Sequence, residues 1–264
     1  MSSKTLLLVA AFVPAVLVGA TVALEGEKEY NVAADKTNTV SDVLAGTGSI
    51  LKTGDGMLVL TGQNTFTGGI KINAGTVKIS SNAAAIGKGP VTLNPAAATK
   101  GTLCRLYINK SGTYANEIIQ AANGYSGTDQ DDASAGLVIE YDVSDCTFTG
   151  KITANGNMSI RPRPKNTGND GGTGPTVKFN GEIAASGKTL VVASYGSPTF
   201  NGKVTCAAFK AVDAWSSGGT ITLANEANEI GSVRVRHNDL KAGKNGAFGG
   251  ALVNVQEAWS TAGK

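Results

Sequence analysis

The chain has 264 residues, of which 35 are glycine and only 16% are charged. A formal net charge of +3 is too small to indicate a nucleic-acid partner, and the single histidine excludes metal sites built on several histidines. Abundant glycine with few charges suits short strands and tight turns, and the length is sufficient for one domain with a continuous core.

Residues 1–20 have the pattern of a secretory signal peptide. Lys4 supplies the positive start, an apolar run follows, and small residues at 18–20 form a cleavage site, with Ala23 as a second option. The alternative is a transmembrane anchor, but the run is short and contains Pro14. We therefore expect cleavage, export and no integral membrane segment in the mature chain.

Short runs of alternating apolar and polar residues, broken by Gly, Asn or Asp, occupy residues 46–255 and predict strands joined by turns. One unit recurs there, an aromatic residue followed four positions later by a β-branched residue. The copies are Phe66 with Ile70, Phe148 with Ile152, Phe179 with Ile183, and Phe200 with Val204. Because an even spacing places both residues on one face of a strand interrupted by a small residue, we expect all of them to point inward. The Gly or Asn between them allows a bend at which the strand can turn a corner.

Recurrence on this scale is typical of a repeat architecture. We predict an all-β, single-chain parallel β-helix (β-solenoid) of about eight to ten rungs, with loop insertions. Residues 21–45 are more charged and less regular, and we expect them to cap the amino-terminal end, where unpaired strand edges would be exposed. Residues 207–215 are predicted to form one short helical turn, and residues 256–264 a carboxyl-terminal tail.

A known repeat family is similar to part of this region. The run from Gly54 to Val77, GDGMLVLTGQNTFTGGIKINAGTV, resembles the autotransporter-associated β-strand repeat, and residues 85–91 resemble its closing element. Residues 247–249 with Val253 look like a second copy of that element. The resemblance implies a passenger-type parallel β-helix that a Gram-negative bacterium secretes or displays on its surface, and it says little about activity.

Three cysteines, Cys104, Cys146 and Cys206, are expected in the mature chain. An odd number in an oxidising compartment allows at most one internal disulfide, for which Cys104 and Cys146 are the first candidates. Two alternatives are a column of reduced, buried thiols inside the solenoid and a free thiol that links two chains.

Arg161, Arg163 and Lys165 form the one dense basic cluster, within a Pro/Gly-rich segment that we expect to be an exposed loop. Such a loop could contact acidic polysaccharide, and a solvated insertion is the alternative.

Asp129, Asp131 and Asp132 could supply oxygen ligands to Ca²⁺, but they lack the spacing of a helix-loop-helix calcium site, so a solvated acidic loop is the alternative.

No catalytic residue and no cofactor is predicted. His237 is expected at a strand-to-turn junction, and no nucleophile motif accompanies it. We predict a non-enzymatic structural or adhesive β-solenoid that forms a homo-oligomer or polymer, as a surface layer or fibre, and that could contact cell-surface polysaccharide. The alternative is an extracellular β-helix that binds or cleaves acidic polysaccharide, with Glu140 or Asp142 near Arg161 or Arg163 in a groove.

Overall fold

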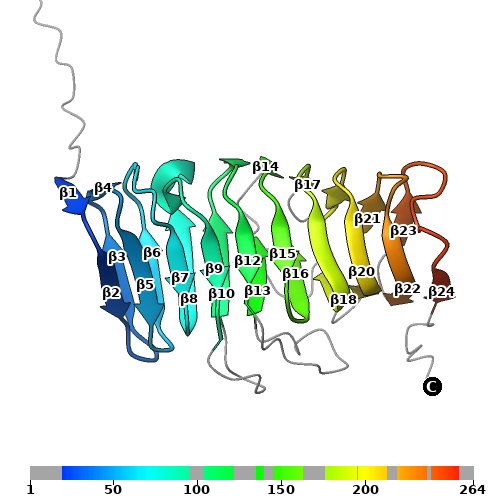
Figure 1. Cartoon of the computed structure of the whole chain (residues 1–264), viewed down its shortest axis with the longest axis horizontal. Helices are drawn as coiled ribbons and strands as arrows, with labels where there is room; N and C mark the ends of the chain where they lie inside the picture. Colours follow the sequence, from blue (N-terminus) through cyan, green and yellow to red (C-terminus); the bar gives the residue numbers. More distant parts are fainter. Residues whose placement is uncertain are drawn as a thin grey trace, which may run out of the picture.

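The computed structural model describes residues 20–95, 104–121, 135–139, 145–162, 176–194, 196–212, 219–236 and 239–255. In these ranges the chain winds into coils stacked along one long axis (Figure 1), and strands of neighbouring coils pair in parallel. Main-chain groups of one coil therefore bond to the coils on either side. The predicted all-β parallel β-helix is confirmed. The predicted tail and all of the signal peptide except Ala20 lie outside the described residues.

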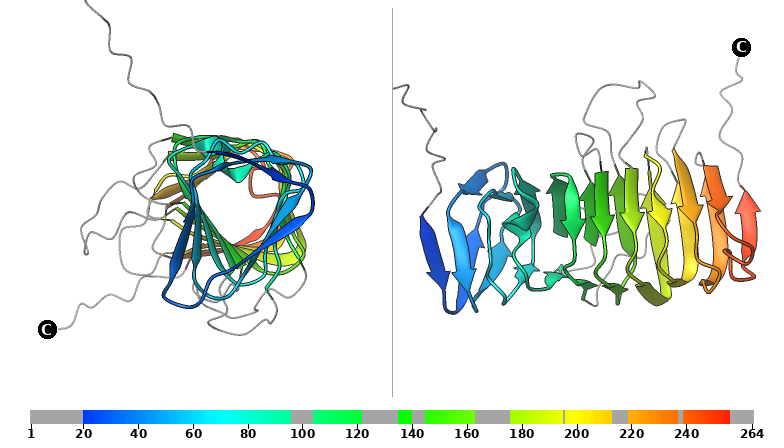
Figure 2. Two further views of the ribbon diagram at one scale, coloured as in Figure 1. Left: turned by 90° about the vertical axis from the view of Figure 1, so that its left-hand side faces the viewer. Right: turned by 90° about the horizontal axis from the view of Figure 1, so that it is seen from above.

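Three faces surround the core (Figure 2). The first arm of a 16-stranded sheet consists of β2 (Glu27–Asn31), β5 (Ser49–Thr53), β7 (Ile70–Ile72), β9 (Val91–Leu93), β12 (Ile118–Gln120) and β15 (Ile152–Ala154). Its second arm consists of β3 (Thr37–Val40), β6 (Met57–Leu60), β8 (Gly75–Ser80), β10 (Cys104–Asn109), β13 (Ala135–Ile139) and β16 (Met158–Pro162). The third face is a 6-stranded sheet of β11 (Gly112–Tyr114), β14 (Asp145–Phe148), β17 (Thr176–Phe179), β19 (Thr199–Phe200), β21 (Thr220–Leu223) and β23 (Asp239–Ala242).

Long strands join the two arms. These are β18 (Ile183–Ala193), β20 (Val204–Val212) and β22 (Glu229–Arg236), and β18 pairs with both β15 and β16. The shorter β24 (Leu252–Val255) pairs with β22. The helical turn predicted for residues 207–215 is wrong for 207–212, which belong to β20. Pairing with β18 on one side and β22 on the other overrides the helix propensity of this alanine-rich stretch.

The amino-terminal segment has the same parallel form as the rest. Here β1 (Thr21–Leu24) pairs with β4 (Val43–Gly46), while β2 and β3 pair with β5 and β6 of the next coil. A 3-10 turn, η1 (Ala83–Ile86), lies between β8 and β9.

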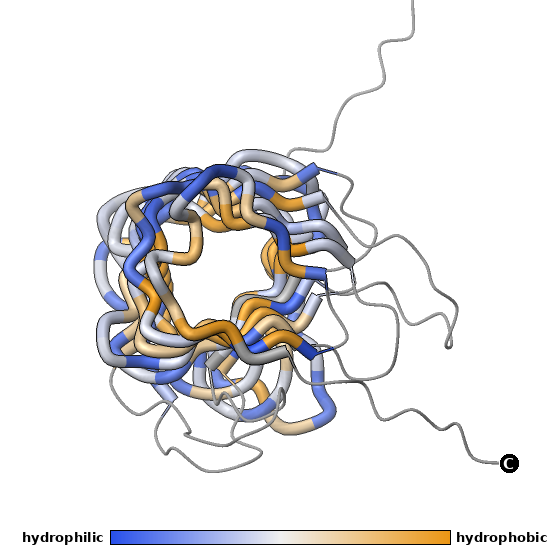
Figure 3. The backbone as a smooth tube through the Cα atoms, turned by 90° about the vertical axis from the view of Figure 1, so that its right-hand side faces the viewer, coloured by the Kyte–Doolittle hydropathy of each residue, from blue (hydrophilic) through white to orange (hydrophobic). Residues whose placement is uncertain are grey.

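Buried apolar side chains fill the inside of the coils and stack in columns. Figure 3 shows hydrophobic residues recurring on each side of the stacked coils. In the first arm, the strand register aligns Ile70 with Val91, then Ile118, Ile152, Ile183 and Val204. On the third face the rings of Tyr114, Phe148, Phe179 and Phe200 stack with centroids 5.4, 5.1 and 4.8 Å apart. Stacked rings at such distances add stability beyond the area they bury.

Phe66 is also fully buried, but it lies in the turn before β7 and outside the ring stack. A Cβ atom at Gly87 would come within 2.7 Å of its ring, so the turn after η1 packs directly on Phe66.

In the copies with Phe148, Phe179 and Phe200, the aromatic and its β-branched partner lie on two strands, one on either side of a corner. Phe148 ends β14 and Ile152 begins β15, and both are at most 2% exposed. The corner that the small residue between them was expected to allow is therefore present, and both side chains point inward. In the copy with Phe200 and Val204, close stacking requires the glycine: a Cβ at Gly202 would lie 2.0 Å from the carbonyl oxygen of Gly181 in the preceding coil.

Candidate functional site

Several residues singled out from the sequence lie outside the described residues. They are His237, the carboxylates Asp129, Asp131, Asp132, Glu140 and Asp142, and the basic residues Arg163 and Lys165. In the part of the chain that the structure describes, no group of three or more His, Cys, Asp or Glu side chains could hold a metal ion. The same part contains no helix of the length and apolarity needed to span a bilayer.

Arg161 is a strand residue. It lies in β16 opposite Val138 of β13 and is only 6% exposed. The prediction of an exposed loop is therefore wrong for Arg161, because pairing with β13 extends the strand as far as Pro162.

The three cysteines are free and buried, so the suggested disulfide between Cys104 and Cys146 is not formed. Cys104 lies in the second arm opposite Gly75, Cys146 lies on the third face opposite Gly112, and Cys206 lies in β20 opposite Ala185. Because each thiol occupies a different column, the alternative of a cysteine column is not formed either. Burial raises the pKa of each thiol to about 12, so all three are protonated near neutral pH.

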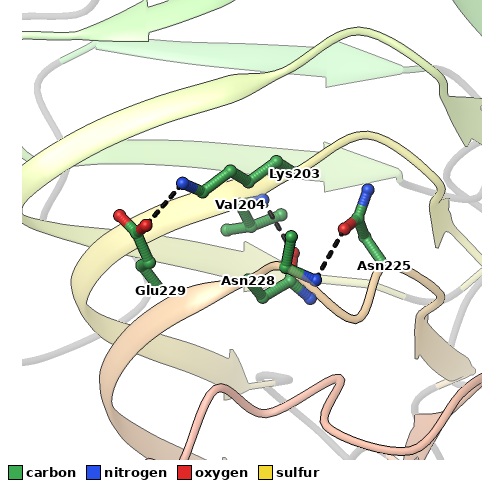
Figure 4. Close-up of polar contacts among 6 residues, drawn as sticks. Lys203, Val204, Asn225, Asn228 and Glu229 are labelled. Atoms are coloured by element: carbon green, nitrogen blue, oxygen red, sulfur yellow. Dashed lines mark hydrogen bonds and ion pairs between the residues drawn. The ribbon is translucent and has the colours of Figure 1, made fainter.

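Two buried asparagines each connect three successive coils. Oδ1 of Asn228 accepts a hydrogen bond from the backbone N–H of Val204 (2.8 Å), and Nδ2 donates to the carbonyl oxygen of Ala247 (2.7 Å). Figure 4 shows the first of these contacts. Asn64 makes the same pair of bonds, accepting from Leu44 N–H at 2.8 Å and donating to Ala85 oxygen at 2.7 Å. We call Asn64 and Asn228 the bridging asparagines.

The bridging asparagines mark two copies of one structural unit. The carbonyl acceptors, Ala85 and Ala247, begin the two segments that the sequence identified as closing elements. In the sequence the second copy appears in residues 247–249 with Val253 and in a degenerate repeat unit in which Ile230 replaces the aromatic residue.

Charged residues alternate in sign at the corner before the first arm. Lys151 pairs with Glu182 at 3.0 Å, and Lys203 pairs with Glu229 at 2.5 Å (Figure 4). These side chains are between 35% and 64% exposed, so each pair contributes well under about 1 kcal/mol. Opposite charges on adjacent coils nevertheless favour this strand register over a shifted one.

An open cleft of about 410 Å³ lies beside the second pair, where β18 forms a bulge between Ala185 and Thr189. Its lining includes Ser186, Thr205, Cys206 and Glu229. The Glu229 carboxylate is paired with Lys203 and the Cys206 thiol is protonated at neutral pH, so these two groups do not form an acid-base pair.

The second arm carries a different charge arrangement on its outer side. Lys210 of β20 lies directly opposite Arg234 of β22, and Arg236 lies two residues further along the same side of β22. All three side chains are half-buried. We call Lys210, Arg234 and Arg236 the basic patch. Its one sequence signal is the alternation Val233-Arg234-Val235-Arg236, which places both arginines on the face opposite to the buried valines.

The comparisons with known proteins agree with this fold. Residues 50–79, which carry β5–β8 in part or whole, match the family model described as the passenger-associated-transport-repeat. The chain is 30% identical over 156 residues, 54% of its length, to the adhesin BmaC autotransporter of Brucella suis biovar 1 (strain 1330), and it spans 4% of the length of that relative. No solved structure matches the chain. The predicted resemblance to autotransporter-associated repeats is confirmed.

Proposed function

We propose that this chain, which carries an autotransporter-associated repeat of the passenger type, is an adhesive segment displayed on the surface of a Gram-negative bacterium. The observation that carries the proposal is its similarity to an autotransporter adhesin over about half the chain. The parallel coils support it physically, because a solenoid places side chains at regular intervals along extended faces, and such faces suit contact with a large partner.

Surface display tests this function. The full chain would be anchored on a non-adherent bacterium, and the number of bacteria retained on epithelial monolayers compared with that for the anchor alone. We expect several-fold more retained bacteria. Gly202→Val is the matched control, because it disrupts the coil at the Gly181 contact while leaving the surface charges in place. Equal retention of the wild-type chain and the anchor alone, at equal display levels, would refute adhesion.

We also propose a non-catalytic role, because the chain is similar to an autotransporter adhesin and carries a passenger-associated repeat. The cleft beside β18 supports this proposal, since its carboxylate, Glu229, is held in an ion pair with Lys203. Incubation with polygalacturonate, with and without Ca²⁺, should yield no unsaturated or reducing-end products. Their appearance would favour a polysaccharide-cleaving β-helix instead.

We also propose that the protein associates with itself through β24. Leu252 and Val253 are 82% and 49% exposed on this strand, an unusual position for two large apolar side chains. Analytical ultracentrifugation over a concentration series should show larger species for the wild type and fewer for Leu252→Asp/Val253→Asp. The exposed Thr113→Asp variant is the control. A monomer at every concentration would refute this proposal.

A further inference from the structure

We propose that the two ends of the solenoid are complementary, so that the carboxyl-terminal coil of one copy docks on the amino-terminal coil of a second copy. The inference rests on the self-association proposed above and names the surface that β24 meets. An interface between two different surfaces leaves one free surface of each kind, so repeated docking builds a filament along the solenoid axis.

Both ends present strand edges that have no ladder partner among the described residues. At one end, β1, β2 and β3 pair only with β4, β5 and β6, and at the other end β23 and β24 pair only with β21 and β22 (Figure 1). An unpaired edge is a template for another strand. Because β24 and β3 both belong to the second arm and all coils wind in the same direction, head-to-tail docking pairs them in parallel, as in the rest of the stack.

The core is incompletely covered at the same two ends. Among the described residues, the half-buried apolar side chains that pack on the core are Val22, Tyr30 and Val40 in the first coil, Leu240, Phe248 and Ala251 in the last, and Ala83 beside η1. Val253 lies in register with Val233, which is 1% exposed, but Val253 itself is 49% exposed. Another coil stacked on each end would remove this apolar surface from water.

The charges of the two end coils are opposite in sign. Residues 20–42 carry five carboxylates and two lysines, a net charge of −3, whereas residues 239–255 carry two lysines and one aspartate, a net charge of +1. Glu27 begins β2 and Lys244 follows β23, so both lie at the corner before the first arm, where neighbouring coils pair lysine with glutamate. Both side chains are exposed, and neither has an ion-pair partner in the part of the chain that the structure describes. Head-to-tail docking therefore extends the alternation of charge across the junction.

A symmetric dimer of two carboxyl-terminal ends fits these observations less well. It would place two surfaces of net charge +1 against each other, and like charges repel. It would also pair β24 with β24 in antiparallel orientation, unlike the parallel pairs of the solenoid. The acidic amino-terminal coil of a second copy meets neither difficulty.

Variants blocked at one end test the proposal. Leu252→Asp/Val253→Asp blocks the carboxyl-terminal end with two charges on β24. Glu27→Lys/Thr39→Pro blocks the amino-terminal end. The carbonyl of Val40 bonds to the next coil, so the N–H of the preceding Thr39 points to the open edge, where proline removes it without breaking a ladder bond.

The wild-type chain should form rods that lengthen with concentration at constant width, as seen by sedimentation velocity and negative-stain microscopy. Each blocked variant alone should stay monomeric at concentrations where the wild type forms long rods, because every junction needs one end of each kind. An equimolar mixture of the two variants should give a dimer and nothing larger. Circular dichroism melting checks that each variant folds.

Charge exchange tests the junction itself. Glu27→Lys alone should raise the concentration for half-assembly about threefold, the effect of one exposed ion pair, and Lys244→Glu in the same chain should restore it. Asp145→Lys is the matched control, because it changes the net charge equally at an exposed residue of β14, far from both ends. Assembly of that control should match the wild type.

The results separate this inference from the proposed self-association. A dimer formed by the amino-end variant alone would show contact between two carboxyl-terminal ends, which overturns head-to-tail docking and leaves association through β24 in place. Long rods of the amino-end variant, or a mixture that stays monomeric, would also overturn it. A wild type that is monomeric at every concentration would refute the proposed self-association and this inference together, whereas adhesion of the displayed chain is measured independently.

Discussion

Replacing a bridging asparagine should destabilise three coils at once. Asn228 is 4% exposed, and its amide satisfies one backbone donor and one backbone acceptor on different coils. In Asn228→Ala the N–H of Val204 and the carbonyl of Ala247 lose their partners inside the protein. An orphaned buried backbone group costs about 1–3 kcal/mol, so the two together should lower the free energy of unfolding by about 2–6 kcal/mol.

Asn225→Ala is the matched control, because it also removes an amide that bonds to the backbone. Asn225 accepts from Ala227 N–H at 2.9 Å and donates to Asn201 oxygen at 3.0 Å, but both bonds are exposed to water. Water replaces the lost partners there, so we expect a cost below about 1 kcal/mol. Urea titration followed by circular dichroism gives the two free energies. Hydrogen exchange at the Val204 amide shows where the structure opens.

Asn228→Asp adds a pH test to the same position. The carboxylate can still accept from Val204 N–H, but it faces the carbonyl oxygen of Ala247 and cannot donate to it. Burial raises the pKa of such a carboxyl in the folded state, so the protonated form is favoured and stability falls as the pH rises through that pKa. The variant should therefore regain stability relative to the wild type as the pH falls from that raised pKa, and the gain should be complete at about pH 4, the ordinary pKa of an aspartate. If Asn228→Ala costs no more than Asn225→Ala, the bridging asparagines do not stabilise the stack as argued here.

Three further predictions concern buried groups elsewhere in the solenoid. Cys104, Cys146 and Cys206 should resist maleimide at pH 7 in the native protein and react fully in denaturant, and rapid labelling of the native protein would contradict their burial. Because their folded pKa values of about 12 exceed the unfolded value of 9.0, their contribution to stability should be complete below pH 9 and lost toward pH 12. Gly202→Ala should lower the free energy of unfolding by at least about 2 kcal/mol in urea titration, because the new Cβ would lie 2.0 Å from the carbonyl oxygen of Gly181 in the preceding coil. A loss below about 0.5 kcal/mol would show that the backbone at this corner shifts to accommodate the methyl group. Burial lowers the pKa of Lys52 in the folded state, so the unfolded chain binds the proton more tightly. Stability should therefore rise with pH as the pH approaches the ordinary lysine pKa of 10.5, and Lys52→Met should remove that part of the pH dependence in urea titrations.

The fold could be predicted from the sequence because the same short pattern of apolar and small residues recurs along the solenoid. An aromatic and a β-branched residue recur with small residues between them, and only stacking of successive coils buries both. Gly150 indicated that the chain can turn a corner between Phe148 and Ile152, but two inward residues four apart are compatible with one straight strand as well as with two strands that meet at a bend. Strand pairing between coils, which the local sequence does not contain, decides between them.

The candidate site was harder to predict for the same reason. Arg161, Arg163 and Lys165 stood out because they are neighbours in the sequence, yet Arg161 is a buried strand residue. Lys210 and Arg234 are 24 positions apart and become neighbours only through the register of β20 and β22. The alternation of valine and arginine in β22 revealed the outward side of that strand but not the strand beside it.

Charge placement on this solenoid supports the observed register at the corner before the first arm. Where Lys151 meets Glu182 and Lys203 meets Glu229, a slip of one coil would bring like charges together, so the alternation favours the observed register. On the outer side of the second arm the same register places Lys210 opposite Arg234, and both side chains take part in further local interactions.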